Sequence, residues 1–489
     1  MAEQMTTTWN GALSHAVTGN ARVDLFYAAS RDIEHARLLH LLKASWKESK
    51  LDTLKIAAYC RDVRGGKGER TLGRQMITWL AQHASAEIKH NLHYFIGVYG
   101  RWDDVLALFG TPLEDAGVEL WASQLKEDMI LLQDADKARL SLAAKWIPSE
   151  NKAADKAYGV CKKLIKKLGL RNQADLRKNY LSPLRKQLDL LERLMCAKEW
   201  DAIQFSKVPS VAMKVHGGKG KAFQRNAGER FEAFKQALAK GKAKVNAKDL
   251  FPHQVVEQYL AGGSAPDELL EAQWRVMLGK GPALGDLSSV LVMSDVSGSM
   301  SGLPMCISIA LGILVSQLTS DAWKGLVMTF ETTPRFHTVT GDTLFEQVES
   351  LRYAPWGGST NFQAALELIL ETALRHSLEQ SAMPKRLIVV SDMQFDMAKG
   401  GSGTNYDTLR RKYDMAGYEV PHLVFWNVNG ATSDFPATAS TPNVSLISGY
   451  SAEVLKCVLQ GVKVSPFTTM MNAISDARYN LITLPDPTE

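Results

Sequence analysis

The first third of the chain repeats apolar and polar positions at the spacing of an amphipathic helix. Between residues 20 and 145, apolar side chains recur every three or four positions, as at Leu38, Leu39 and Leu42, and short breaks separate the runs. Residues at this spacing share one face of a helix, so each run predicts a helix that buries one side. The runs follow no fixed period of the kind that named repeat families show. We therefore expect an irregular, HEAT-like stack of helices.

From residue 288 the pattern changes to short apolar runs separated by helical segments. Such runs are typical of strands buried on both faces of a parallel sheet. They occupy residues 290–293, 325–330, 385–391, 420–428 and 444–447, with an edge strand near 332–339. A Gly-Lys-Gly-Pro break at 279–282 precedes them. We expect an α + α/β protein, with a helical-repeat module in residues 1–283 and a doubly wound, mostly parallel, Rossmann-like domain in residues 284–489.

Oxygen-bearing side chains follow the expected strands at the point where each strand ends. Asp295, Ser297 and Ser299 form the spacing Asp-x-Ser-x-Ser, Thr360 follows Gly-Gly-Ser, and Asp392 ends a third apolar run. The carboxyl ends of parallel strands meet at one edge of a sheet, where ligands bind. Carboxylates and hydroxyls suit a hard cation that keeps some water. This pattern predicts a divalent metal site, with Mg²⁺ favoured and Mn²⁺ or Ca²⁺ as alternatives.

The five residues of this pattern resemble the metal-ion-dependent adhesion site of von Willebrand factor A domains. The resemblance implies that Asp295, Ser297, Ser299, Thr360 and Asp392 hold the ion directly or through water. It also implies that one coordination position stays open for an acidic group of a partner. A bound metal could instead activate water for hydrolysis. We find no histidine cluster and no nucleophile-elbow serine in the sequence, so we expect no enzyme activity.

Two glycine-lysine loops lie in the N-terminal part. Residues 61–70 contain Gly65-Gly66-Lys67-Gly68, and a second Gly-Gly-Lys-Gly occupies residues 217–220. Neither lysine precedes the serine or threonine of a P-loop, which excludes that class of nucleotide site. Glycines and cations at a helix start can instead grip phosphates, or the loop can be a connector with solvated charges. The candidate RNA contacts are Arg61, Arg64, Lys67, Arg70, Arg74, Lys214, Lys219, Lys221, Arg225 and Arg230.

Charge is distributed unevenly along the 489 residues, whose formal net charge is +5. Residues 1–286 hold 44 Lys and Arg against 33 Asp and Glu, whereas residues 287–489 hold 13 against 19. Residues 151–250 alone hold 24 against 9. A basic module joined to an acidic one favours a polyanionic partner for the basic part. Phe223 and Phe231, which lie among these cations, could stack on bases or could belong to the core.

The cysteines and the N-terminus indicate the compartment. The five cysteines never occur in Cys-x-x-Cys spacing, so neither a disulfide framework nor a zinc site is predicted. The chain starts without a signal-peptide pattern, and its longest apolar run, near residues 307–318, is too short to span a bilayer. We expect no membrane association and a cytoplasmic protein, in the host cytoplasm for a viral member.

The order of modules is similar to that of the Ro ribonucleoprotein (TROVE) family, in which a ring of helical repeats is closed by a von Willebrand A-like domain. A closer resemblance, over nearly the entire chain, is to an uncharacterised Ro-like family of plants, fungi, large DNA viruses and bacteriophages. Residues 61–70, 208–214, 229–231 and 293–300 carry it. The more distant Ro resemblance implies binding of structured or misfolded RNA.

These observations lead to one main hypothesis and two alternatives. The main one is a non-enzymatic RNA-binding protein, whose basic module grips RNA and whose metal site docks a second ligand. The first alternative is a protein-interaction or assembly factor that uses the metal to bind an acidic residue of a partner. A metal-dependent hydrolase is the weaker alternative. Sequence alone leaves the oligomeric state open.

Overall fold

The structure is a computed structural model that describes residues 5–133, 139–319, 323–329, 334–354, 362–396, 405–459 and 464–486. It is a mixed α and β protein, with helices in the N-terminal part and a mostly parallel sheet in the C-terminal part. This confirms the order of secondary structure that the hydrophobic pattern predicts. Within the described residues, no helix is both long enough and apolar enough to cross a membrane.

The N-terminal part begins with a short hairpin and continues as packed helices. Each longer helix buries one apolar stripe, as α2 does with Leu38, Leu41 and Leu42. The elements are β1 (Met5–Thr7), β2 (Leu13–His15), α1 (Ala21–Ala28), α2 (His35–Glu48), α3 (Lys50–Arg61), α4 (Arg70–His83), α5 (Ser85–His93), α6 (Glu114–Gln133), α7 (Ala143–Trp146), α8 (Ala153–Tyr158), α9 (Val160–Leu168), α10 (Gln173–Leu176), α11 (Ser182–Gln187), α12 (Leu191–Cys196), α13 (Ser210–His216), α14 (Ala222–Ala239), α15 (Pro252–Leu260) and α16 (Glu268–Leu278).

The C-terminal part contains a six-stranded sheet in the order β5-β4-β3-β6-β7-β8. Only the edge strand β5 is antiparallel to its neighbour. The strands are β3 (Val290–Ser294), β4 (Leu326–Thr329), β5 (Phe336–Thr338), β6 (Arg386–Ser391), β7 (His422–Asn427) and β8 (Val444–Ser448). The helices are α17 (Leu303–Leu318), α18 (Leu344–Arg352), α19 (Phe362–Arg375), α20 (Asn405–Ala416), α21 (Lys456–Leu459) and α22 (Pro466–Ile474).

Both faces of this sheet are buried. Along β3, Val290 and Val292 face a core that includes α17 and α22, whereas Leu291 and Met293 face a core that includes α19. Successive side chains of a strand point to opposite faces, so a strand covered on both sides is apolar at most of its positions. The continuous apolar runs in the sequence arise from this double burial.

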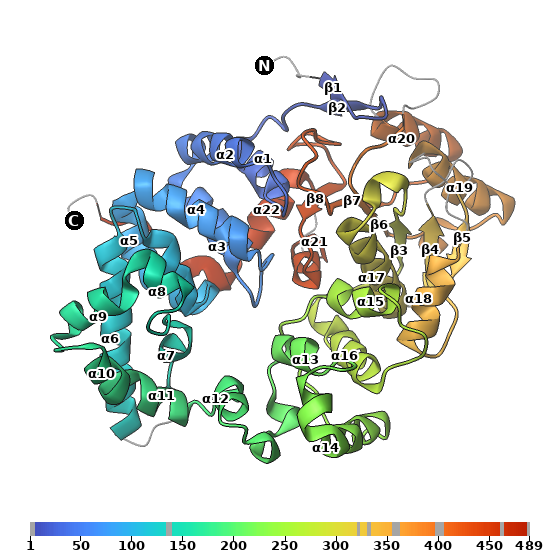
Figure 1. Cartoon of the computed structure of the whole chain (residues 1–489). Coiled ribbons are helices and arrows are strands. Elements are labelled where there is room, and N and C mark those ends of the chain that lie inside the picture. The colour runs from blue at the N-terminus through green and yellow to red at the C-terminus, as the bar shows by residue number, and fades with distance from the viewer. Residues whose placement is uncertain are drawn as a thin grey trace.

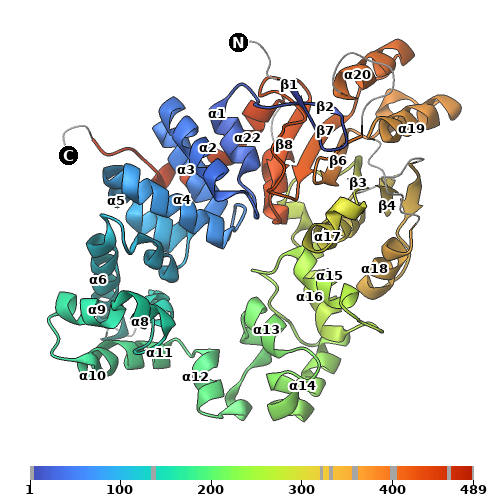
Figure 2. The same ribbon diagram turned by 45° about the horizontal axis from the view of Figure 1, so that its top comes forward.

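The chain curves round and closes on itself, as the two views in Figures 1 and 2 show. Helix α22 packs on α3 and α1, and β8 lies against α1. The N-terminal hairpin also reaches the sheet part, because the Thr8 hydroxyl donates to the Phe395 carbonyl at 2.7 Å. One hydrophobic core runs from the N-terminal helices through α15 and α17 into the sheet, so it continues across residues 283–284.

Candidate functional site

The first glycine-lysine loop is folded tightly against the end of α3. The Lys67 amide donates to the Tyr59 carbonyl at 3.0 Å. A Cβ atom at Gly66 would lie 2.0 Å from that same carbonyl oxygen, and Gly68 has a φ of +70°. Glycine is therefore required here for close backbone packing and for a left-handed turn. These two roles explain the glycines without any phosphate.

The arginines beside this loop are held by two buried carboxylates. Arg61 is 1% exposed, and its Nε donates to Asp104 at 2.7 Å. Arg74 reaches Asp104 at 2.7 Å and Asp103 at 2.8 Å, and Arg70 also pairs with Asp103. The Arg61 guanidinium is thus buried and paired, and it does not lie on an exposed loop. That Arg61 contacts RNA stays a prediction. Arg70 and Arg74 remain partly exposed, but their charges are already paired.

Lys67, the central residue of the loop, is also buried. It is 1% exposed, and its Nζ donates to the carbonyls of Phe26 and Ala29 and to the Ser448 hydroxyl. Burial lowers the pKa of Lys67 to about 8. Phe26 and Ala29 belong to the N-terminal helices and Ser448 to β8, so Lys67 joins the two parts of the molecule. Its three hydrogen-bond acceptors belong to the protein, so in this conformation the Lys67 ammonium is not exposed to a phosphate.

The second glycine-lysine loop stays on the surface. Lys219, Lys221 and Arg225 are exposed and form no ion pair within the described part of the chain. Lys214 pairs with Glu257 at 3.0 Å, and Arg230 donates to two backbone carbonyls. Three of the five predicted contacts here are thus available to an anion.

The two phenylalanines between these cations are core residues. Phe223 is 0% and Phe231 is 1% exposed, and both rings pack on Phe205. Their rings cannot stack on bases in this conformation. Of the two interpretations of these rings, the core one is correct.

Acidic residues of α6 neutralise part of the charge of residues 151–250. Lys163 on α9 pairs with Glu114, and Lys167 pairs with Asp115 at 2.8 Å and with Glu119 at 3.1 Å. The basic run of α9 therefore stabilises the packing of two helices. Charge counted along the sequence overstates the charge that is available for a partner.

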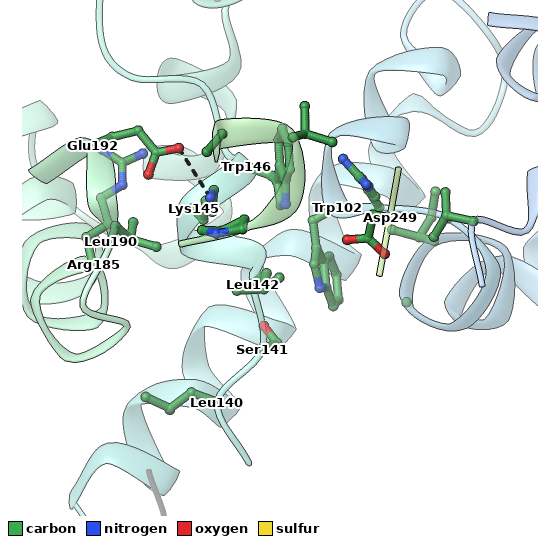
Figure 3. Close-up of a pocket in the computed structure, with 18 of the residues that line it drawn as sticks. Trp102, Leu140, Ser141, Leu142, Lys145, Trp146, Arg185, Leu190, Glu192 and Asp249 are labelled. Atoms are coloured by element: carbon green, nitrogen blue, oxygen red, sulfur yellow. Dashed lines mark ion pairs between the residues drawn. The ribbon is translucent and has the colours of Figure 1, made fainter. Parts of the chain in front are cut away.

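A large cavity lies on the inner side of the curved chain. Its volume is about 1320 Å³, and residues of α5, α7, α11, α12 and α13 and the segment 246–249 line it. Figure 3 shows part of this lining, including Trp102, Trp146 and the ion pair between Lys145 and Glu192. Small-molecule sites usually measure about 300–1,000 Å³, so this cavity has the size for part of a polymer. We call it the inner cavity.

The lining of the inner cavity is basic and contains an accessible tryptophan. Six of its residues are Lys or Arg and two are acidic, Glu192 and Asp249; the basic ones are Arg64, Arg101, Lys145, Arg185, Arg193 and Lys248. Half-buried Trp146 has the Arg101 guanidinium and the Lys145 ammonium each 5.6 Å from its ring. Proteins that bind single-stranded nucleic acid combine cations, which contact the phosphates, with aromatic rings on which the bases stack.

Only Arg64 of these six cations is among the RNA contacts predicted from the sequence, although Arg185, Arg193 and Lys248 lie in the basic segment 151–250. The other five come from separate helices and loops, and none belongs to a recognisable motif. Arg101 was missed because it precedes Asp103 and Asp104 within an acidic local sequence. No signal in the sequence distinguishes these five from the remaining surface cations, since only the curvature of the chain brings them together.

The predicted metal residues lie at the carboxyl end of the sheet. Asp295 is 0% exposed, and it accepts from the Ser297 amide at 2.9 Å and from the Ser391 hydroxyl at 2.6 Å. Ser297 and Ser299 place their hydroxyls 3.1 Å apart, and Ser299 interacts with the Asp392 side chain. Four predicted ligands thus converge on one edge. Thr360 lies outside the described residues.

The charge balance at this edge fits a cation. Burial raises the pKa of Asp295 to about 6 and also raises the pKa of Asp392, which is 2% exposed. Neither carboxylate forms an ion pair with a Lys, Arg or His among the described residues. Two neighbouring buried carboxylates without a basic partner cost free energy that a bound divalent ion would offset. Within the described ranges, no group of three or more His, Cys, Asp or Glu side chains is arranged to hold a metal ion. A cation at this edge would therefore need the serine hydroxyls as ligands in addition to the two carboxylates.

Fold and site together define a protein with a helical N-terminal part, a mostly parallel sheet and a cation-lined inner cavity. A family model described as a domain of unknown function, DUF2828, matches residues 8–110 and 111–287, and a second, DUF7788, matches residues 289–479. An uncharacterised protein of Acanthamoeba polyphaga mimivirus is 33% identical over 501 residues, covering 96% of this chain and 86% of the relative. The chain belongs to the DUF2828 family.

One solved structure is also similar over most of the chain. It is the crystal structure of the Ro (RSR) protein of Deinococcus radiodurans, at 15% sequence identity and a TM-score of 0.34, covering 90% of this chain and 92% of that one. A likeness of this size says nothing about ligands, so function must be argued from the residues of this chain.

Proposed function

We propose that this protein is a non-enzymatic RNA-binding protein that holds a single-stranded part of a structured or misfolded RNA in the inner cavity. The observation that carries the proposal is the lining of that cavity, which includes six Lys or Arg residues, two acidic residues and Trp146. Cations in a groove neutralise phosphates, and an aromatic ring offers a surface for a base. RNA is chosen over DNA because of the sequence resemblance to the Ro family.

The pairing of the cavity cations supports a ligand that brings negative charge. Arg64, Arg101 and Lys248 form no ion pair with any described residue. Burial lowers the pKa of Arg101, because its charge is poorly solvated. An RNA phosphate would restore the missing interaction and would form a charge-assisted hydrogen bond.

We assign no catalytic step to the cavity. Its histidines, His93 and His216, lie beside the rings of Tyr94 and Phe223, and neither is hydrogen-bonded to a carboxylate among the residues that the structure describes. Activation of water or of a nucleophile requires a positioned base with an orienting partner. The lining residues therefore serve binding.

The test compares RNA affinity of full-length protein and two matched double variants. Lys145→Gln with Arg193→Gln removes two cavity cations, whereas Lys156→Gln with Lys162→Gln removes two exposed lysines of α8 and α9 that lie outside the cavity. Each lost phosphate contact should weaken binding and should reduce the salt dependence by about one unit of slope. A single-stranded RNA, its DNA counterpart and a hairpin RNA are titrated at several salt concentrations. Equal losses in both variants would place the RNA elsewhere, and no salt-dependent RNA binding by the unaltered protein would refute the proposal.

A second candidate function is metal-dependent docking of a protein partner. It is favoured by the unpaired carboxylates Asp295 and Asp392, which we propose to hold Mg²⁺ in the manner of a von Willebrand A adhesion site. The N-terminal hairpin lies beside this edge, since the Trp9 amide donates to the Gln394 side chain at 2.7 Å. The Trp9 side chain is 93% exposed, so a partner with an acidic residue and an apolar neighbour would fit there.

Crosslinking followed by affinity purification separates the two functions. Asp295→Ala should abolish Mg²⁺-dependent partner capture and leave RNA affinity unchanged, because the inner cavity does not include Asp295. Partners retained by the variant would rule out metal docking. A loss of RNA affinity in the same variant would show that the metal site and the inner cavity are coupled.

A further inference from the structure

A second, smaller pocket lies where the helical part meets the sheet part. Its volume is about 400 Å³, and it is lined by the loop 61–70, residues 248–254, residues 277–284 and residues 451–453. Val63, Arg64, Arg101, Val211, Lys248 and Asp249 line both this pocket and the inner cavity. The two hollows therefore adjoin. We call the smaller one the junction pocket.

The lining of the junction pocket carries more positive charge than its surroundings neutralise. Arg64, Arg101, Lys248 and Lys280 line it and form no ion pair within the described part of the chain. The acidic lining residues are Asp249 and Glu453, and Glu453 already pairs with Lys456 at 2.6 Å. Lys280 donates to the Lys248 carbonyl at 3.1 Å, which fixes its ammonium at the pocket without neutralising it.

Arg61 adds an independent observation that indicates a ligand. Its side chain lines the pocket and is 1% exposed, and its Nη1 has no hydrogen-bond partner. A buried guanidinium N–H without an acceptor costs free energy, and such groups in native structures usually meet a ligand, an ion or water. An anion in the junction pocket would supply that acceptor.

The junction pocket also has apolar lining residues. Leu250, Phe251, Met277, Leu284 and Leu314 line it. A volume of about 400 Å³ lies within the range of small-molecule sites, and a few converging charges beside apolar walls are typical of such sites. A ligand with a compact anion at one end and a flat, weakly polar body at the other would match both kinds of lining residue.

We propose that the junction pocket binds a nucleoside phosphate, with the phosphate toward Arg61, Arg64, Arg101 and Lys280 and the base toward Phe251 and Met277. The nucleoside phosphate is either a free nucleotide or the phosphorylated end of an RNA strand that lies in the inner cavity. The second source rests on the proposed RNA binding, whereas the first does not. An occupant would contact the loop 61–70, α16 and residues 451–453 at once, and so would tie the two parts of the molecule together.

The experiment titrates full-length protein with the four nucleoside 5′-monophosphates, with inorganic phosphate, and with one RNA sequence that ends in a 5′-hydroxyl, a 5′-phosphate or a 3′-phosphate. The key variant is Lys280→Gln, because Lys280 lines the junction pocket and not the inner cavity. Its control is Lys162→Gln, which removes an exposed lysine of α9 outside both hollows. Thermal unfolding of each variant verifies that it is folded.

We expect a phosphorylated ligand to bind at least about tenfold more tightly than the same ligand with a hydroxyl in place of the phosphate. The Lys280→Gln variant should lose this difference in affinity, and the Lys162→Gln variant should keep it. Binding of free monophosphates supports the first source, and discrimination between RNA ends supports the second. If RNA binds with the same affinity whatever its end and no monophosphate binds, the proposed phosphate site in the junction pocket is refuted, whereas the proposed RNA binding is not. If monophosphates bind and RNA does not, the proposed RNA binding is refuted, whereas the proposed phosphate site in the junction pocket is not.

Discussion

The Asp62 carboxylate accepts hydrogen bonds from the Arg478 guanidinium, although the two residues are 416 positions apart. Asp62 follows α3, and Arg478 lies in the short 3₁₀ helix Ala477–Leu481 that follows α22. The Tyr479 hydroxyl donates to the same carboxylate at 2.9 Å, and Asp62 is 0% exposed. The start and the end of the chain are thus joined at one buried charge, beside the loop that the sequence singled out for RNA.

Breaking this contact should destabilise the closed chain. Arg478→Ala would leave the Asp62 carboxylate buried without its cation, so we expect a loss of about 3–5 kcal/mol in the free energy of unfolding. Asp62→Ala should cost less, because the Arg478 side chain is 30% exposed and can turn to solvent. Urea denaturation followed by circular dichroism measures both. Asp201→Asn is the control, since its carboxylate is 98% exposed, and an equal loss there would contradict the prediction.

The burial of Lys67 predicts a variant that separates stability from RNA binding. Lys67→Met would leave two carbonyls and the Ser448 hydroxyl without their donor, which should lower stability by about 1–3 kcal/mol. The RNA affinity of the folded fraction should not change, because Lys67 lines neither the inner cavity nor the junction pocket. Fluorescence anisotropy below the unfolding temperature checks this. A drop in affinity comparable with that of the cavity double variant would restore Lys67 to the RNA-contacting set.

Magnesium should raise the unfolding temperature through the Asp295 and Asp392 edge. A ligand that binds only the folded state stabilises it by about 2.7 kcal/mol at a hundred times its dissociation constant. Scanning calorimetry with and without Mg²⁺ measures the shift. Asp295→Asn should abolish it and, without metal, should be neutral or stabilising, because it removes a buried charge whose pKa is raised to about 6. A shift that persists in this variant would place the ion elsewhere.

Acid should destabilise the protein through His253 on α15. This side chain is 3% exposed and stacks on Phe251, and burial lowers its pKa to about 3, with Arg31 and Lys214 adding positive charge nearby. The unfolded chain takes up a proton near pH 6.5 and the folded chain does not, so stability falls as the pH drops below 6.5.

The measurement compares wild type with His253→Gln, which does not titrate. Between pH 7 and pH 5 the wild type should lose about 2 kcal/mol more than the variant in urea denaturation. His422, whose pKa burial lowers to about 4, titrates in both proteins and cancels in the difference. Parallel pH profiles of the two proteins would mean that His253 is protonated in the folded state.

Local patterns of the sequence determined the order of helices and strands. The apolar runs that became β3, β6, β7 and β8 were recognisable because burial on both faces favours apolar residues at successive positions of a strand. The placement of Asp295 and Asp392 at one edge followed as well, since parallel strands end on the same side of a sheet. These features depend on residues close to one another in the sequence or on a rule of topology.

The tertiary structure alone decided which charges are free. Lys67 looked like a ligand-binding cation in the sequence, but its ammonium is buried and donates to the hydroxyl of Ser448, 381 residues away. Arg101, Lys248 and Lys280 looked ordinary, yet they meet at the junction pocket. The sequence determines which side chains carry a charge. Whether such a charge can bind a ligand depends on its solvent exposure and on ion-pair partners that only the folded chain brings close.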